Sequence, residues 1–169
     1  AVAHMDTVYD PAEPIILDGM ICSSGVDNRF GVYVAAELLH EKGIHADVLF
    51  TTNEERCMST ARHFAAPQGK KYNWLVEFDR RGAGAALYQY QHDAEVWCAA
   101  LVRAGLNPVV GTYSDIADLS HLGCKALNLG IGYCDNVHSP DAWLDLDLAV
   151  EQLHRFACFY RRNHRRWFV

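Results

Sequence analysis

The sequence lacks long hydrophobic runs and an excess of positive charge. No apolar stretch approaches the roughly 20 residues of a membrane-spanning helix, so no transmembrane segment and no membrane partner are expected. The 169 residues include 15 Lys and Arg against 21 Asp and Glu, a net charge of −6, which argues against a nucleic-acid-binding surface. The short basic run at 161–166 is interpreted as the solvated last turns of a terminal helix.

Cysteines with metal-binding or redox spacing are also missing. Six cysteines are present, but no two of them follow a C-x-x-C pattern, so neither a zinc ribbon nor a disulfide scaffold is predicted. Free cysteines are typical of a reducing compartment, and no signal peptide is visible, so a cytoplasmic location is expected. The length is that of one domain with a sizeable core, covering residues 1–169.

What the sequence does contain is an alternation of short apolar runs with amphipathic segments, which is typical of an α/β fold. The final helix is expected to turn Leu146, Val150, Leu153, Ala157 and Tyr160 toward the core. Strands are predicted near 1–8, 48–52, 72–78, 85–90 and 125–131, and helices near 25–43, 57–66, 94–104, 115–121 and 144–162, with a small hairpin around 14–17.

The apolar run at 48–52 leads directly to two adjacent carboxylates, Glu54 and Glu55. Two neighbouring carboxylates repel each other unless a cation or a proton holds them. A buried strand that delivers paired acids to its carboxyl end is typical of a metal-hydrolase site in an open α/β sheet. Such a pair on its own is more often simply solvated, so this interpretation depends on the rest of the chain.

Further acids and histidines fall at expected strand ends or in the loops that follow them. His4 and Asp6 stand in a His-x-Asp spacing, in which a carboxylate can anchor the second ring nitrogen of a metal-binding His. Asp79 and His138 follow later strands, and Asp27 opens a helix, where it could be a plain N-cap or could bridge two metal ions. Because strand ends meet at one edge of an open sheet, this set suits zinc or a similar metal.

Taken in order, these residues resemble the motifs of the dinuclear zinc exopeptidase superfamily, which includes bacterial aminopeptidases, peptidase T and glutamate carboxypeptidase. Five short segments carry this resemblance. No single one of them is specific, but their order and spacing are, and together they cover nearly the whole chain. The resemblance implies a three-layer α/β/α fold with a mostly parallel mixed central sheet, of the phosphorylase/hydrolase-like zinc peptidase type. The matching segments are 3–8 (AHMDTV), 25–31 (GVDNRFG), 50–55 (FTTNEE), 78–79 (FD) and 136–140 (NVHSP).

The same resemblance implies two divalent metal ions, most simply Zn²⁺, and hydrolysis of a peptide bond near a chain terminus. Asp6 would orient His4, and Glu54 would act as the general base. Two adjacent metal ions can activate a water molecule and stabilise the developing oxyanion. The implied metal ligands are His4 and Asp79 for one ion, Glu55 and His138 for the other, and Asp27 as the bridge between them.

Substrate-binding residues are less clearly marked. Tyr113, Ser114, Asp115 and Arg80 are predicted to line the substrate pocket, and the Ser-Asp pair resembles a recurring feature of the superfamily. The alternative interpretation is that Ser114 and Asp115 are a helix cap and that Arg80 is a solvated turn residue. The substrate class is a peptide, and the alternatives are a deacylase that acts on N-acyl amino acids and an inactive metal-binding interaction module.

The spacing of the motifs leaves little room for a second domain. The gaps of 138 − 79 = 59 and 27 − 4 = 23 positions are too short for a lid or dimerisation domain, so a bare catalytic domain is expected. Members of the superfamily usually have strands before the His-x-Asp strand, whereas only residues 1–3 precede it here. Either a homo-oligomer or an upstream segment is therefore expected to cover the exposed part of the sheet.

Overall fold

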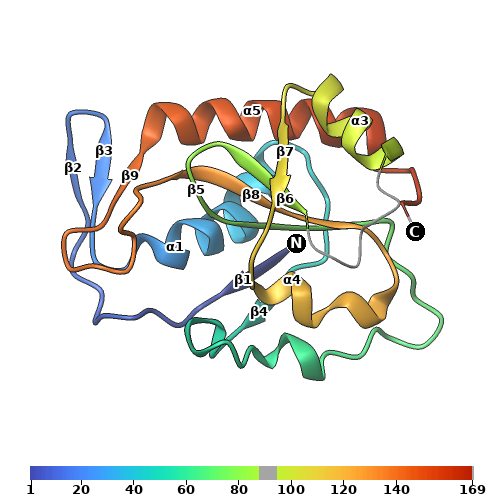
Figure 1. Cartoon of the computed structure of the whole chain (residues 1–169), viewed down its shortest axis with the longest axis horizontal. Coiled ribbons are helices and arrows are strands. Elements are labelled where there is room, and N and C mark those ends of the chain that lie inside the picture. The colour runs from blue at the N-terminus through green and yellow to red at the C-terminus, as the bar shows by residue number, and fades with distance from the viewer. Residues whose placement is uncertain (88–94, 169) are drawn as a thin grey trace.

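The computed structural model describes residues 1–87 and 95–168, and these contain a nine-stranded sheet flanked by helices (Figure 1). The strand order is β2-β3-β9-β8-β5-β1-β4, and β6, which also pairs with β7, joins β8 off this path. The strands are β1 (Val2–His4), β2 (Ile15–Leu17), β3 (Met20–Cys22), β4 (Leu49–Thr51), β5 (Leu75–Arg81), β6 (Gly84–Leu87), β7 (Asn107–Val110), β8 (Ala126–Tyr133) and β9 (Trp143–Asp145).

Four adjacent strands, β4, β1, β5 and β8, run parallel to one another and form the centre of the sheet. The hairpin β2–β3, the strand β9 and the pair β6–β8 add antiparallel contacts around this centre. The predicted fold class, a mixed sheet with a mostly parallel core and flanking helices, is confirmed. Since parallel strands end at the same edge, the residues that follow β4, β1 and β5 are brought close together.

The helices lie on both faces of the sheet. The longest, α5, begins where the Asp145 side chain accepts a hydrogen bond of 2.9 Å from the backbone N–H of Leu148, and it ends in Arg161 and Arg162, which suit the helix dipole. The helices are α1 (Val26–Tyr33), α2 (Leu39–Glu41), α3 (Glu95–Arg103), α4 (Asp115–Asp118) and α5 (Leu146–Asn163), with a π-turn at Val34–Leu38 and 3₁₀ turns at Glu54–Arg56, Thr60–His63 and Ser120–Leu122.

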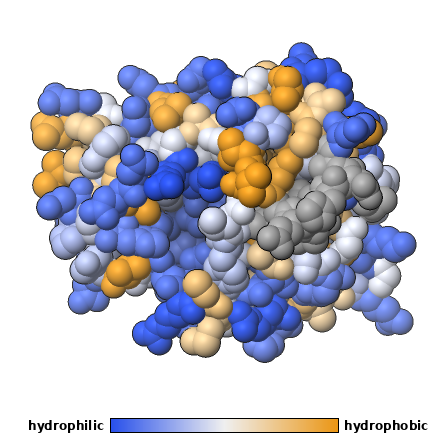
Figure 2. All heavy atoms as spheres, viewed as in Figure 1, coloured by the Kyte–Doolittle hydropathy of each residue, from blue (hydrophilic) through white to orange (hydrophobic). Residues whose placement is uncertain are grey.

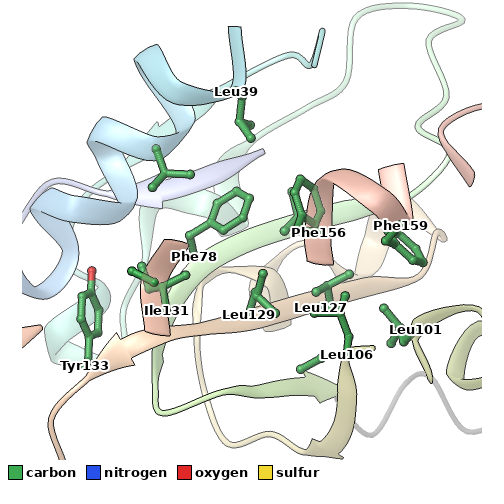
Figure 3. Packing of buried hydrophobic residues seen from close by; sticks show 14 of the residues in the cluster. Leu39, Phe78, Leu101, Leu106, Leu127, Leu129, Ile131, Tyr133, Phe156 and Phe159 are labelled. Atoms are coloured by element: carbon green, nitrogen blue, oxygen red, sulfur yellow. The ribbon is translucent and has the colours of Figure 1, made fainter. Parts of the chain in front are cut away.

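Strand β5 shows how the two faces are covered. Val76 and Phe78 point toward the larger core cluster, which includes residues of α5, and the Phe78 ring meets that of Phe156 edge-on at a centroid distance of 5.0 Å (Figure 3). Leu75 points to the opposite face, where it joins a smaller cluster that includes Ile116 of α4. This alternation along one strand gives the sheet a helical layer on each face, as a three-layer fold requires.

Most of the predicted inner face of the last helix packs against the core: Leu146, Leu153, Ala157 and Tyr160 are partly buried against the larger cluster. Val150 was predicted wrongly, because it is 52% exposed. The fully buried positions of the helix include two phenylalanine rings that were not predicted, and these remove a large apolar surface from water. The buried residues are Ala149, Gln152, Phe156, Phe159 and Asn163.

Two other elements differ from the predictions. The helix expected at 57–66 is only the 3₁₀ turn at Thr60–His63, which the Ser59 hydroxyl caps and which the extended backbone of Phe64 ends. Strand β7 was not predicted. It contains Pro108 and, among the described residues, pairs with β6 alone, and an edge strand tolerates proline. The predicted strand at 85–90 is present up to Leu87, and positions 88–90 lie outside the described residues.

The ends of the main strand order lie at β4 and β2, and β7 forms the edge of the side branch through β6. Strand β1 is not an edge, because it pairs with β5 on one side and β4 on the other. At the opposite edge, Ile15, Ile16 and Leu17 of β2 are all more than half exposed, and they contribute hydrophobic surface at the left of the molecule (Figure 2). Among the described residues, no helix combines the length and apolar character needed to cross a membrane.

Candidate metal centre

The ends of the parallel strands bring acids and histidines together at one edge of the sheet. His4 is the last residue of β1, and the 3₁₀ turn after β4 carries Glu54 and Glu55, hereafter the acidic pair. Asp79 lies in β5, Asp27 in the first turn of α1, and His138 in the loop between β8 and β9. All six side chains that the sequence placed at a metal site or as its base therefore converge, although their roles remain predictions.

His4 lies at the centre of the group and is only 1% exposed. Its Nε2 atom is 3.2 Å from Asp27 Oδ1, 3.5 Å from Asp79 Oδ1 and 3.8 Å from Glu54 Oε2. A buried imidazole nitrogen surrounded by three carboxylates can be held either as a proton donor or as one ligand of a shared cation.

Asp27 faces both histidines. Its Oδ1 atom points to His4, while its Oδ2 atom lies 3.0 Å from Nε2 of His138, and that same nitrogen is 3.0 Å from Glu55 Oε2. The two carboxylate oxygens of one residue are thus directed to two different histidines. A bridging carboxylate between two metal ions would need this arrangement.

Asp27 is not the N-cap of α1, which is Gly25. Its carboxylate oxygens face His4 and His138 instead, and its φ and ψ of −87° and 114° are not helical. The peptide bond between Asp27 and Asn28 is cis. A Cβ atom at Gly31 would clash with the Asn28 side chain and with the carbonyl oxygen of Phe78, so glycine at this position lets α1 approach β5 closely.

Asp6 contacts both His4 and the acidic pair. Its backbone oxygen lies 3.0 Å from His4 Nδ1, and its carboxylate Oδ1 is farther away, at 3.6 Å. The carboxylate instead accepts hydrogen bonds from the backbone N–H groups of Glu54, at 3.4 Å, and Glu55, at 3.3 Å. Asp6 therefore anchors the ring nitrogen of His4 that faces away from the acids, and it also supports the turn that carries the acidic pair.

The charges at this edge are strongly coupled. Burial raises the pKa of Glu54 to about 7 and that of Glu55 to about 7, and neighbouring carboxylates such as Asp27 add to both increases. Burial alone would also raise the pKa of Asp27, but hydrogen bonds from His138 and His4 hold it below its usual range. A divalent cation would supply the positive charge that protons and imidazolium groups supply without it.

The donor atoms fit a divalent metal ion. Among the described residues, the buried oxygen Glu55 Oε1 has no hydrogen-bond partner, and Asp27 Oδ1 and Asp79 Oδ1 have none beyond the shared His4 ring nitrogen, at 3.2 Å and 3.5 Å, which is costly unless a cation or a proton satisfies them. Ligand atoms of His4, Asp27 and Glu55 lie within 4.8 Å of one another, and so do those of His4, Glu54 and Asp79. Imidazole nitrogen with carboxylate oxygen is a donor set that zinc accepts.

Glu54 therefore lies among potential ligand atoms, although the motif resemblance makes it the base. The distinction matters because a general base must keep an oxygen free to accept a proton. His138, with a side chain that is 56% exposed, is the most open member of the group. Its position leaves one side of the centre accessible from solvent.

The predicted substrate residues are not alike in their surroundings. Ser114 and Asp115 are 1% and 0% exposed, so they lie beneath the metal centre. The Ser114 hydroxyl donates a 2.5 Å hydrogen bond to Glu77, and the Thr51 hydroxyl donates one of 2.5 Å to Asp115. A substrate-binding role for these two residues stays a prediction, and their observed partners are protein side chains.

Tyr113 and Arg80 are less deeply placed. The Tyr113 hydroxyl donates to Asp118 at 2.6 Å and accepts from the backbone N–H of Ser59 at 3.1 Å. Arg80 is half-buried on β5, with its guanidinium stem beside Gly84 of β6. Their predicted contact with substrate is likewise untested.

Sequence reasoning missed Asn128, which supports Asp79, and it ranked Glu77 below Asp79 as a metal ligand. Asn128 in β8 brackets Asp79: its Oδ1 atom accepts from the Asp79 backbone N–H at 3.0 Å, and its Nδ2 donates to the Asp79 backbone oxygen at 3.3 Å. Glu77, on the same face of β5 as Asp79, is fully buried. A signal for Asn128 was present, because it is the one polar side chain in the apolar run 126–131.

We expect the stability of the metal-free protein to fall as the pH rises from about 5 to about 8. The pKa values of Glu54 and Glu55 are raised from 4.5 to about 7 on folding. A raised pKa means that the folded state binds more protons. The stabilisation is thus present below the unfolded pKa and is lost as the pH passes the folded pKa. The lowered pKa of Asp27 acts only in more acidic solution.

Thermal melts of chelator-treated protein across this pH range measure the effect. Saturating zinc should increase the melting temperature more at the alkaline end, because metal binds the deprotonated ligands. The double variant Glu54→Gln, Glu55→Gln should show a flatter dependence. A melting temperature that stays level or rises for the metal-free wild type would contradict the burial of two uncompensated carboxyl groups.

The fold and the acids at its strand ends place the chain in a structural class, that of the α/β aminopeptidase fold. Aminopeptidase PepT from Bacillus cereus is 14% identical and superposes over 94% of this chain and 78% of its own, with a TM-score of 0.61. Aminopeptidase APDkam598 from the archaeon Desulfurococcus kamchatkensis is 19% identical, over 87% of this chain and 50% of its own, with a TM-score of 0.58. PhTET1-12s, a dodecamer in its asymmetric unit, is 21% identical, over 86% of this chain and 53% of its own, with a TM-score of 0.51.

At these identities the similarity shows the fold, and at that level the resemblance to the zinc exopeptidase superfamily is confirmed. The chain spans about half the length of APDkam598 and of PhTET1-12s. No protein-family model and no curated protein sequence matches the chain.

Proposed function

We propose that this chain is a metal-dependent exopeptidase of the aminopeptidase type, which holds two divalent ions, most simply Zn²⁺, and cleaves a peptide bond at a chain terminus. The observation that carries the proposal is the position of Asp27, whose two oxygens lie 3.2 Å from His4 and 3.0 Å from His138. A solvated or capping aspartate has no reason to face one histidine at the end of β1 and another in the loop between β8 and β9. A carboxylate that bridges two ions does.

Each acid or histidine of the centre would have a separate role. His4 and Asp79 would hold one ion, Glu55 and His138 would hold the other, and Asp27 would span both. When bound, the ions supply Lewis acidity, which makes water a better nucleophile and stabilises negative charge on the carbonyl oxygen of the scissile bond.

Glu54 would take the proton from the attacking water and pass it to the leaving amine. A general base works best when its pKa lies near the working pH, and burial raises the pKa of Glu54 to about 7 without metal. Asp6 fixes the direction of this carboxylate, because it accepts hydrogen bonds from the backbone N–H groups of the acidic pair. The likeness to aminopeptidases of solved structure supports peptide substrates.

The direct test is metal analysis of protein purified without chelator, followed by a screen of aminoacyl, carboxy-terminal and N-acyl amino acid substrates. We expect bound zinc and hydrolysis of aminoacyl substrates that stops when a chelator removes the metal. Hydrolysis of N-acyl amino acids alone would make the protein a deacylase. Metal without any hydrolysis would make it an inactive metal-binding module. Protein that holds no metal after zinc is supplied would overturn the proposal.

A further inference from the structure

The segment 52–60, which carries the acidic pair, is closed at its base and contains a tight turn, in which the backbone N–H of Cys57 donates to the oxygen of Glu54 at 2.7 Å and that of Met58 to the oxygen of Asn53 at 3.0 Å. The backbone N–H of Thr60 donates to the oxygen of Thr52 at 2.9 Å, and the N–H of Thr52 donates to Thr60 Oγ1 at 3.0 Å. Between these ends, Asn53 and Cys57 adopt left-handed conformations with φ of 63° and 53°. Such conformations are unfavourable for residues other than glycine and persist where the surroundings hold them.

Three side chains, Tyr113, Asp118 and Arg62, supply an outer support that we call the clasp. Asp118 Oδ2 accepts hydrogen bonds from the Tyr113 hydroxyl at 2.6 Å and from Arg62 Nη2 at 3.1 Å. The Tyr113 oxygen in turn accepts from the backbone N–H of Ser59 at 3.1 Å. Arg62 donates to the backbone oxygens of Ser59, at 3.0 Å, and Cys57, at 3.2 Å. One carboxylate oxygen therefore organises a phenol and a guanidinium that both bind the segment.

The clasp is tied to the sheet through α4. Asp118 is the last residue of this helix, and Asp115, its first, accepts a hydrogen bond from Thr51 at the end of β4. Ile116 of the same helix is fully buried in the smaller core cluster. The clasp therefore joins the turn to a helix that is packed in the core, while Asp6 supports the same turn from the side of the metal centre.

We propose that Tyr113, Asp118 and Arg62 are positioning residues that set the direction of the acidic pair toward the metal ions. The inference rests on the function proposed above. It gives Tyr113, predicted from the sequence to line the substrate pocket, a role through its hydrogen bonds to the segment 52–60, and it adds Asp118 and Arg62. The segment that carries Glu54 and Glu55 is held by Asp6 at one point and by the clasp at another. Loss of Asp6 or of the clasp would therefore let the segment rotate the two carboxylates. Removal of such outer partners typically costs about 10–100-fold in metal affinity or activity.

The test uses Tyr113→Phe, which removes one hydroxyl and keeps the ring. We expect a zinc dissociation constant, measured by competition with a chelator, that is about 10–100-fold higher than that of the wild type. The visible absorption spectrum of the Co²⁺-loaded protein should also change, because it reports ligand geometry. The matched control is Tyr160→Phe, which loses a hydroxyl that likewise bridges backbone groups, here the N–H and the oxygen of His45 at 3.3 Å each.

A second variant, Arg62→Ala, separates positioning from folding. Arg62 is 40% exposed, so its loss should leave the fold intact, which circular dichroism can verify. We expect weaker zinc binding that guanidinium chloride, at concentrations too low to denature, partly restores. Zinc affinity and Co²⁺ spectra of Tyr113→Phe and Arg62→Ala that match Tyr160→Phe would overturn the clasp and leave the proposed function standing. A wild-type protein that binds no zinc would overturn both.

Discussion

Replacement of Glu54 by glutamine is expected to lower turnover by about 10²–10⁴-fold, the usual contribution of general-base assistance. The substitution keeps the size of the side chain and most of its packing, but the amide cannot accept a proton from the attacking water. Bound zinc should hardly change if Glu54 is not a ligand. Turnover and metal content of wild type and variant, measured on the same preparations, test both statements.

The matched control is Glu55→Gln, in the adjacent position of the acidic pair. Because Glu55 Oε2 lies 3.0 Å from His138 Nε2 beside Asp27, this variant should lose metal as well as rate. The structure also allows Glu54 to be a metal ligand, because its Oε2 atom is 3.8 Å from His4 Nε2 and it forms a possible ligand group with His4 and Asp79. If Glu54→Gln lost one ion, Glu54 would be a ligand, and near-normal turnover would exclude it as the base.

Replacement of Asp27 by alanine is expected to remove most of the bound zinc, since its two oxygens face the histidines of both predicted sites. His138→Ala should have a smaller effect and lower the content from two ions toward one, with the site of His4 and Asp79 still occupied. Metal analysis after equilibration with zinc and removal of free ion measures both variants.

An exposed histidine elsewhere provides the control for this series. His45 lines a cavity of about 590 Å³ at the amino ends of β1, β4 and β5, away from the acids. His45→Ala should retain the wild-type zinc content. Equal losses from His45→Ala and His138→Ala would point to nonspecific binding, and full zinc content in Asp27→Ala would remove the argument for a bridging carboxylate.

The general fold could be predicted because the strands and helices of each layer have a recognisable pattern of apolar residues in the local sequence. Short apolar runs such as 125–131 predicted buried strands, and the structure confirms β8 at that position. Prediction was weaker where local and tertiary forces compete. The last helix was correct in extent, and four of the five residues predicted for its inner face pack against the core, but its fully buried positions Phe156 and Phe159 were not predicted. Strand β7, which contains Pro108, was not predicted and pairs with β6.

The sequence by itself determined which donor groups the centre would contain and their order along the chain. Acids and histidines that directly follow apolar runs must gather at one edge of a parallel sheet, whatever the details of the loops. His4 and the acidic pair could be brought together on this basis, since β1 and β4 pair in register from Val2 with Leu49 to His4 with Thr51.

Only the tertiary structure decided how those donors face one another. Asp27 and His138 are 111 positions apart, and the direction of the Asp27 carboxylate depends on two non-helical residues at the start of α1. The same holds for Ser114 and Asp115, which pattern alone allowed as pocket residues and which the fold buries against Glu77 and Thr51. Side-chain direction follows from backbone dihedral angles and long-range packing, and neither is encoded in the local spacing of residue types.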